Sequence, residues 1–237
     1  MNNKQHIQVP NKSTLTPNEK LVYAFLKKHY NNETKVSYPS FNLLMKETGL
    51  SRQTLVDCIT SLEVKKYINV TRAPKKVNIY TFNPYNTFDI FSFDFLEDTE
   101  LPLEVKKHIL CVQEYMFVDK DTHEGKISYT NEELSDLTGL SLKAINRAIK
   151  WLTENNYIRT SSLKLKDFST GLRKEITFYN LDKLNQAILY TLSDHEDRIS
   201  SLERVVQKRD EQIEALTKEI MKLKKERNQN LQDAIIL

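Results

Sequence analysis

Glycine is scarce in this chain, which contains four glycines among 237 residues. Loops that wrap the phosphates of a nucleotide use several glycines within a few positions, commonly followed by Lys-Ser or Lys-Thr. Gly49 is instead followed by Leu-Ser-Arg, and the other three glycines are far apart. The sequence therefore excludes a glycine-rich phosphate loop.

Cysteine is also rare, and the two thiols, Cys58 and Cys111, are well separated. No Cys-x-x-Cys or His-x-x-x-His pair occurs, so the chain lacks the ligand spacings of a zinc site. Each cysteine falls beside apolar positions of an expected helix, which indicates a buried thiol in a reducing cytosol. His123-Glu124-Gly125 could form an acid-base pair, although these residues before a strand favour a turn. We expect a non-enzymatic protein with no metal or cofactor.

Long apolar runs are missing as well. Residues 1–12 are polar, and no stretch approaches the roughly 20 apolar residues of a membrane-spanning helix. We therefore expect a cytoplasmic protein that does not contact a membrane.

A repeat is the most informative feature that the chain does contain. Residues 44–68 and 134–158 align without a gap, and nine of the 25 paired positions are identical. The identical pairs are Leu44/Leu134, Thr48/Thr138, Gly49/Gly139, Leu50/Leu140, Ser51/Ser141, Ile59/Ile149, Leu62/Leu152, Tyr67/Tyr157 and Ile68/Ile158.

The shared residues predict two helices joined by a tight turn. Gly49 and Gly139 accept the positive φ that such a turn calls for, and Ser51 and Ser141 are good N-caps for the helix that follows. Apolar residues then recur at helical spacing and predict a buried face. They are Leu55, Ile59 and Leu62 in the first copy and Ile145, Ile149 and Leu152 in the second.

The opposite face of each second helix suits DNA. Arg, Lys, Asn and Gln pair with base edges in the major groove, and Ser or Thr at a helix start suits phosphates. The candidates are Ser51, Arg52, Gln53, Thr54 and Thr60 in the first copy, and Ser141, Lys143, Asn146, Arg147 and Lys150 in the second. Water alone would also satisfy such a polar face, so this pattern does not decide the function by itself.

A β-hairpin with a basic tip is expected after each second helix. Residues 67–71 and 77–82 alternate and are rich in β-branched residues, as are residues 157–161 and 176–179. The basic residues of the tips are Arg72, Lys75 and Lys76 in the first copy and Lys164, Lys166, Arg173 and Lys174 in the second. Trp151, the only tryptophan, is expected to pack on the second hairpin.

This order of elements resembles the winged-helix family of DNA-binding domains, over about residues 15–83 and 102–180. Residues 15–23 (LTPNEKLVY), 38–40 (YPS) and 48–55 (TGLSRQTL) also resemble the winged helix of bacterial phage and plasmid replication initiation and regulatory proteins. The second copy has Ser-Tyr-Thr-Asn at 128–131 where the first has Ser-Tyr-Pro-Ser at 37–40. The resemblance implies that the second helix of each motif enters the major groove of double-stranded DNA while the wing reaches the flanking backbone or minor groove.

Charge is distributed unevenly along the chain. Residues 1–85 contain 13 Lys and Arg against 5 Asp and Glu, whereas residues 86–125 contain 3 against 10. The basic segment favours attraction to DNA phosphates. The acidic segment alternates with Phe91, Phe93 and Phe95, which predicts a linker that docks its rings and keeps its carboxylates in water. Alternatively, these acids mask the basic face of the first domain. Pro102 then precedes a helix expected from Leu103 to about Val118.

The last segment has a heptad pattern that predicts a parallel two-stranded coiled coil. Arg209 and Arg227 occupy seam positions and weaken the preference for one oligomeric state. An antiparallel or higher-order assembly, or a helix folded back on its own domain, therefore stays open. The apolar end, residues 234–237, is a candidate surface for a further protein partner. The expected dimerisation residues are Ile199, Leu202, Val206, Ile213, Leu216, Ile220 and Leu223.

These features predict a mainly α fold with small β-hairpin wings (α+β). The expected parts are a flexible N-terminal arm (1–13), a first winged helix (14–85), an acidic and aromatic linker (86–101), a second winged helix (102–190) and a coiled coil (191–237). We expect a homodimeric, sequence-specific transcription regulator of a bacterial, phage or plasmid system that binds double-stranded DNA. One alternative is a replication initiator or a partition (centromere-binding) protein of a phage or plasmid. Another is a coiled-coil scaffold whose winged helices contact proteins.

Overall fold

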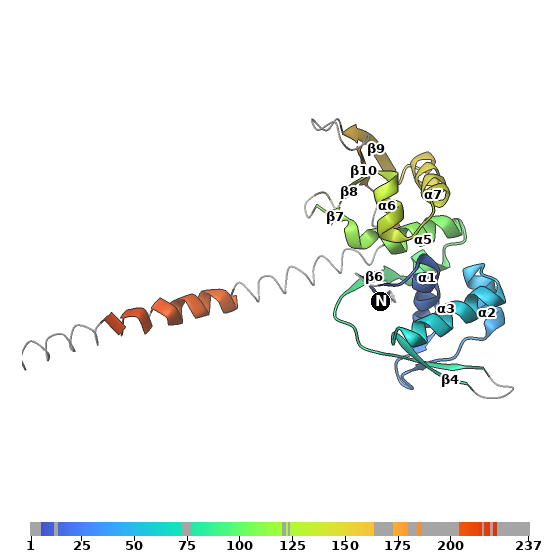
Figure 1. The fold of residues 1–237 in the computed structure, drawn as a ribbon, viewed down its shortest axis with the longest axis horizontal. Helices are drawn as coiled ribbons and strands as arrows, with labels where there is room; N and C mark the ends of the chain where they lie inside the picture. The colour runs from blue at the N-terminus through green and yellow to red at the C-terminus, as the bar shows by residue number, and fades with distance from the viewer. Residues whose placement is uncertain are drawn as a thin grey trace, which may run out of the picture. The chain divides into compact units, whose positions relative to one another are not determined.

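The computed structural model describes residues 6–11, 14–72, 77–119, 122, 124–163, 173–179, 184–185, 204–214, 216–218 and 220–221. The chain divides into two units, residues 1–191 and residues 192–237. The first unit contains both copies of the repeat (Figure 1).

The first copy begins with α1 (Pro17–Lys28), β2 (Tyr30–Asn31) and β3 (Val36–Ser37). It continues through the helix pair α2 (Phe41–Thr48) and α3 (Arg52–Val64), and ends in the hairpin β4 (Ile68–Thr71) and β5 (Ile79–Phe82). The strands form an antiparallel sheet in the order β2-β3-β5-β4. The helix pair and the hairpin that follows it are in the order that the sequence predicted, whereas β2 and β3 were not predicted.

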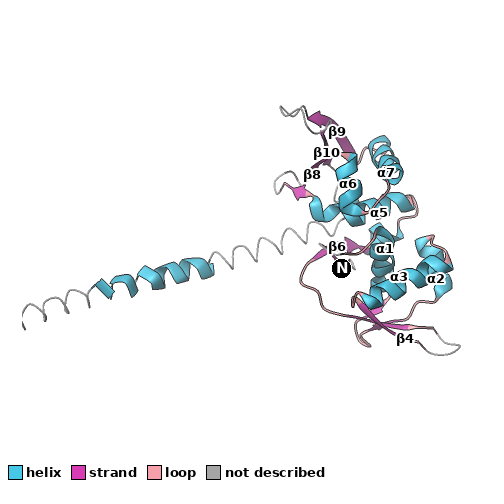
Figure 2. Cartoon of the chain, in the orientation of Figure 1, coloured by secondary structure: helices cyan, strands magenta, loops and turns pink. Residues whose placement is uncertain are grey.

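The second copy repeats this plan. It contains α5 (Leu103–Val112), a 3-10 turn (Gln113–Tyr115), β7 (Phe117–Val118), β8 (Gly125–Tyr129), α6 (Asn131–Thr138), α7 (Leu142–Glu154), β9 (Ile158–Leu163) and β10 (Arg173–Phe178). The sheet order β7-β8-β10-β9 matches that of the first copy. Figure 2 shows helices α5, α6 and α7 of this copy together with strands β8, β9 and β10. The expected helix to about Val118 was too long, because the chain leaves the helix after Val112 and residues 117–118 pair with β8.

Local sequence explains where the helices start and stop. Thr16 and Glu19 form a capping box at the start of α1, with Pro17 at a position that needs no donor. Gly49 and Gly139 end α2 and α6 with φ of 64° and 69°, in the left-handed region that glycine adopts without steric cost. The predicted turn between the two helices of each motif is therefore confirmed.

The expectation of a flexible arm is wrong for residues 6–10. This segment is β1 (His6–Pro10), which pairs antiparallel with β6 (Phe88–Ser92) and buries Ile7 and Val9. The short helix α4 (Phe93–Glu97) follows β6. The segment from β6 through α4, which the sequence suggested was a linker, thus supplies secondary structure to the unit.

The aromatic residues of the acidic segment dock as predicted. Phe91, Phe95 and Leu96 are buried, and Phe93 is half-buried and packs against the core. Asp89 contradicts the expectation that every carboxylate stays in water. Asp89 is 7% exposed and accepts a hydrogen bond from Nδ2 of Asn11 (3.1 Å). Burial raises the pKa of this carboxyl to about 6.

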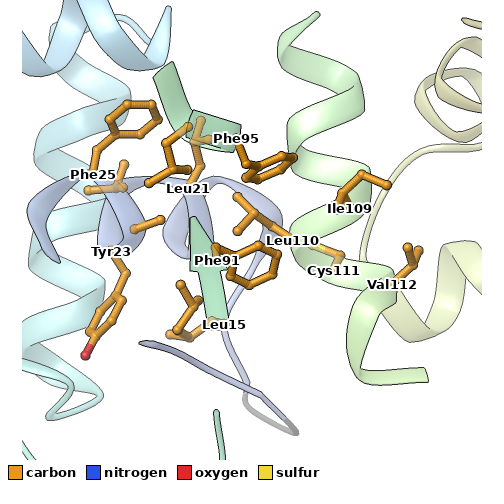
Figure 3. Close-up of a cluster of buried hydrophobic side chains, with 14 of the residues drawn as sticks. Leu15, Leu21, Tyr23, Phe25, Phe91, Phe95, Ile109, Leu110, Cys111 and Val112 are labelled. Atoms are coloured by element: carbon orange, nitrogen blue, oxygen red, sulfur yellow. The ribbon is translucent and has the colours of Figure 1, made fainter. Parts of the chain in front are cut away.

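One hydrophobic core joins the two copies. Helix α1 packs on α5, and Figure 3 shows Leu21, Phe91 and Leu110 among the side chains that α1, β6 and α5 contribute to this cluster. A buried ion pair crosses the same region, with Lys20 Nζ lying 2.9 Å from Glu114 Oε1. The copies are therefore parts of one packed body.

In the second unit, residues 204–214, 216–218 and 220–221 are helical. Four of the predicted seam residues, Val206, Ile213, Leu216 and Ile220, are described there and are 52–61% exposed. The other three, Ile199, Leu202 and Leu223, lie outside the described residues.

Candidate nucleic-acid interface

Helix α3 is oriented by its buried face. Leu55, Ile59 and Leu62 are buried, and Ser51 Oγ caps the helix by accepting a hydrogen bond from the Thr54 N–H (3.2 Å). The outward face therefore carries Arg52, Gln53, Val56, Asp57 and Thr60, all of which are exposed.

Two side chains on the outward face of α3 are held by neighbours. The guanidinium of Arg52 lies 5.0 Å from the ring centroid of Phe41, the first residue of α2, which is a cation–π distance. Nε2 of Gln53 donates to Oδ1 of Asp57 at 2.8 Å, one turn along the helix. Both contacts restrict the rotamers of these side chains at the N-terminal end of α3.

Helix α7 presents a different outward face. Leu142, Lys143, Asn146, Arg147 and Lys150 are exposed. Oδ1 of Asn146 accepts a hydrogen bond from Nδ2 of Asn131, the first residue of α6, at 2.7 Å. Arg147 lies 3.5 Å from Glu104, and Lys150 lies 3.7 Å from Glu154. These exposed pairs are weak in water, so both cations remain available to phosphates.

The wings are described only in part. Arg72 is 54% exposed at the side chain and makes two hydrogen bonds to Glu63, of 3.1 and 2.5 Å. This hydrogen bonding lowers the pKa of the Glu63 carboxyl, and the sequence reasoning did not anticipate the pair. Arg173 and Lys174 lie in β10 beside β9, whereas Lys75, Lys76, Lys164 and Lys166 lie outside the described residues.

Trp151 packs toward the second wing, as predicted. Its ring stacks on that of Tyr157 at 5.8 Å with an angle of 13° between the planes, and Tyr157 directly precedes β9. This stacking ties the end of α7 to the start of the wing.

The start of α1 lies beside the end of α3 and beside the turn that precedes α7. Glu19 Oε2 lies 2.8 Å from Nζ of Lys65, the residue that caps the end of α3. A methyl group at Gly139, in the turn before α7, would lie 3.5 Å from Cδ of Pro17. The first turn of α1 therefore lies between the end of α3 and the turn that precedes α7.

The start of α5 makes the corresponding contacts. A methyl group at Gly49, in the turn before α3, would lie 3.3 Å from Cδ2 of Leu103, and the adjacent Glu104 pairs with Arg147 of α7. Each copy thus places the start of its first helix against the turn of the other copy. Such reciprocity is the pattern of a twofold relation, although here it arises within one chain. Nothing in the sequence repeat revealed it.

Among the residues that the structure describes, the cysteine and histidine side chains with large pKa shifts are buried and do not lie on the outward face of α3 or α7. Burial raises the pKa of Cys58 to about 11 and of Cys111 to about 12, so both thiols are unreactive, as expected for buried cysteines. Burial also lowers the pKa of His108 to about 4 and keeps its ring neutral. Among the residues that the structure describes, no cluster of His, Cys, Asp and Glu could hold a metal ion.

Two family models match the chain, one on each copy. A helix-turn-helix domain model matches residues 13–68, and a winged helix-turn-helix DNA-binding model matches residues 128–159. No curated protein matches the chain. The two matches coincide with the α2–α3 and α6–α7 pairs and support DNA binding by tandem helix-turn-helix domains. Neither indicates a catalytic family.

In the described part of the chain, no helix is both long enough and apolar enough to cross a membrane.

Proposed function

We propose that this protein is a sequence-specific transcription regulator that reads double-stranded DNA with two unequal recognition helices on each chain, in a bacterial, phage or plasmid system. The observation that carries the proposal is the reciprocal packing of the two copies, in which the starts of α1 and α5 lie against the turns that precede α7 and α3 and pair with Lys65 and Arg147. Because these contacts belong to one packed body, the spacing of the two recognition helices is set by the fold and not by a flexible linker.

The first copy is the stronger reader in this proposal. Arg52 suits the O6 and N7 acceptors of guanine, and Gln53 suits adenine. The corresponding residues of α7 are Leu142 and Lys143, which offer fewer hydrogen bonds to bases. The second copy then contributes mainly phosphate contacts through Lys143, Arg147 and Lys150.

The positions of the wings suit an extended target. Figure 1 shows β4 at one end of the first unit and β9 with β10 at the other, with α1 and α5 between them. Wings at opposite ends would reach backbone on both sides of a site that the two recognition helices occupy. A spaced bipartite site therefore fits better than a single short half-site.

Replacing Arg52 and Gln53 together by Ala tests the reading of bases. We expect the variant to lose its preference for the selected site, since each lost bidentate contact costs roughly 1–3 kcal/mol of discrimination. A salt-sensitive, sequence-independent affinity should remain. Lys35→Ala, which removes one charge from an exposed turn, is the control. Unchanged sequence preference in the double variant would refute the assignment.

We propose that the tail joins two chains. The exposed Val206, Ile213, Leu216 and Ile220 would be buried by a second helix, and the heptad spacing favours a coiled coil. Truncation after residue 190 should convert the dimer to a monomer, so the mass measured by sedimentation should fall by more than half. In the full chain, Ile213→Lys should shift the protein toward monomer while Glu211→Lys does not. A truncated protein that keeps the assembly state of the full chain would exclude this role.

A replication origin or partition site is the second candidate target. Two recognition helices held at a fixed spacing suit an array of spaced repeats as well as a promoter. Once one of the linked helices binds, the effective concentration of the other at the neighbouring site is raised. Footprinting on bound genomic fragments separates the two, since a regulator protects promoters and an initiator or partition protein protects repeat arrays.

A further inference from the structure

Two large aliphatic side chains interrupt the polar recognition faces. Val56 of α3 is 39% exposed and Leu142 of α7 is 42% exposed. The core positions of the same helices, such as Leu55 and Ile145, are fully buried. Val56 and Leu142 therefore do not belong to the hydrophobic core of the unit.

Their neighbours indicate what covers them. Val56 lies one turn from Arg52 and next to Asp57, while Leu142 adjoins Lys143 and lies one turn from Asn146. A surface on which charged and amide side chains surround a single aliphatic group is poorly matched to an apolar protein partner. It matches the floor of the major groove, where hydrogen-bonding base edges surround one apolar group, the 5-methyl group of thymine.

We propose that Val56 and Leu142 are specificity-determining residues, each of which contacts the 5-methyl group of a thymine in its own half of the site. This inference rests on the proposed function and adds the identity of a base to it. In the repeat alignment Val56 pairs with Asn146, and Leu142 pairs with Arg52. The thymines therefore fall at different places in the two halves, and the half-sites are not copies of one another.

Uracil substitution tests the contact at the level of one methyl group. A duplex selected from random DNA is remade with each thymine changed singly to uracil, which removes only the 5-methyl group. At two thymines the wild-type affinity should fall about fourfold, the value of one buried methylene-sized group. Val56→Ala should abolish the uracil effect at one of these thymines, and Leu142→Ala should abolish it at the other.

Matched variants on the same framework serve as controls. Val64→Ala removes an exposed valine (75% exposed) from the far end of α3, and Leu137→Ala removes a leucine of α6 that is exposed to the same 42% as Leu142. Both should leave every uracil effect in place. All four side chains are exposed, so none of the substitutions should unfold the protein. Thermal melting verifies this.

The outcomes separate the two claims. If the protein selects a motif but no thymine responds to uracil, or if Val56→Ala and Leu142→Ala keep the wild-type uracil pattern, the thymine contacts are wrong while the proposed function stands. If random DNA yields no enriched motif, both the thymine contacts and the proposed function are refuted.

Discussion

The buried Lys20–Glu114 ion pair allows a direct test of whether the two copies share one core. The pair links α1 of the first copy to the turn that follows α5 in the second, and its side chains are 3% and 4% exposed. Both charges are thus removed from water, and each is compensated by the other. Glu114→Leu would leave the ammonium of Lys20 buried without this carboxylate.

The expected loss is large. Breaking a buried ion pair by removing one partner costs about 3–5 kcal/mol, whereas replacing both partners by apolar residues is often neutral or stabilising. For a body of this size each kcal/mol lowers the midpoint of thermal unfolding by roughly 2–4 °C. Glu114→Leu should therefore lower it by roughly 6–20 °C, and the double variant with Lys20→Met should recover most of the loss.

Calorimetry of the wild type and the variants measures both the size and the cooperativity of the effect. Since α1 and α5 share one core, both copies should unfold in one transition, and the single variant should shift that whole transition. Separate melting of the two copies would refute a common core. A loss below about 1 kcal/mol in Glu114→Leu, without recovery in the double variant, would refute the energetic role of the pair.

Three further perturbations have defined outcomes. Asp89→Asn should raise thermal stability at pH 7 and have little effect at pH 4. The folded pKa of Asp89, about 6, exceeds the ordinary value of 3.8, so the ionised carboxylate destabilises the folded protein, and this destabilisation grows as the pH rises from about 4 to 6. The gain at pH 7 is at most about 3 kcal/mol, and urea unfolding at both pH values measures it. Gly139→Ala should lower the free energy of unfolding by about 1 kcal/mol, because alanine is strained at this positive φ. Gly49→Ala should lower it further, because the added methyl group would lie closer to Leu103 than the one at Gly139 lies to Pro17. Chemical denaturation measures both losses, and equal or absent losses would contradict this. Glu63→Gln should free Arg72 from its ion pair and strengthen DNA binding at low salt, and this gain should vanish in high salt. Anisotropy titrations measure the affinity, and no change at either salt would exclude competition between Glu63 and DNA for Arg72.

The sequence predicted the parts that depend on neighbouring residues. Gly49 with Ser51, and Gly139 with Ser141, specify a turn and a cap within three positions, and the spacing of Leu55, Ile59 and Leu62 specifies the face that is buried. Wing strands follow from alternation over a few residues. The outward faces of α3 and α7 are then predicted as well, because the residues opposite the buried face of such a helix are exposed.

The parts that the sequence reasoning missed depend on distant pairings. The β1–β6 register joins His6 to Ser92, and a five-residue strand has no local signal for a partner so far along the chain. The contacts of Pro17 with Gly139 and of Leu103 with Gly49 likewise arise only when the two copies pack together. The Glu63–Arg72 and Gln53–Asp57 pairs are instead close in sequence, but water, a neighbouring side chain or DNA would each satisfy such exposed polar groups, so the sequence does not select among these partners.

Selection of bound duplexes from random DNA by the full-length chain tests whether the fold holds α3 and α7 at one spacing on DNA. We expect one enriched bipartite motif, with two non-identical halves at a fixed spacing. That spacing should be unchanged in a chain truncated after residue 190, since the first unit alone holds both recognition helices. A library that shows no enrichment, or a motif whose halves vary freely in spacing, would contradict it.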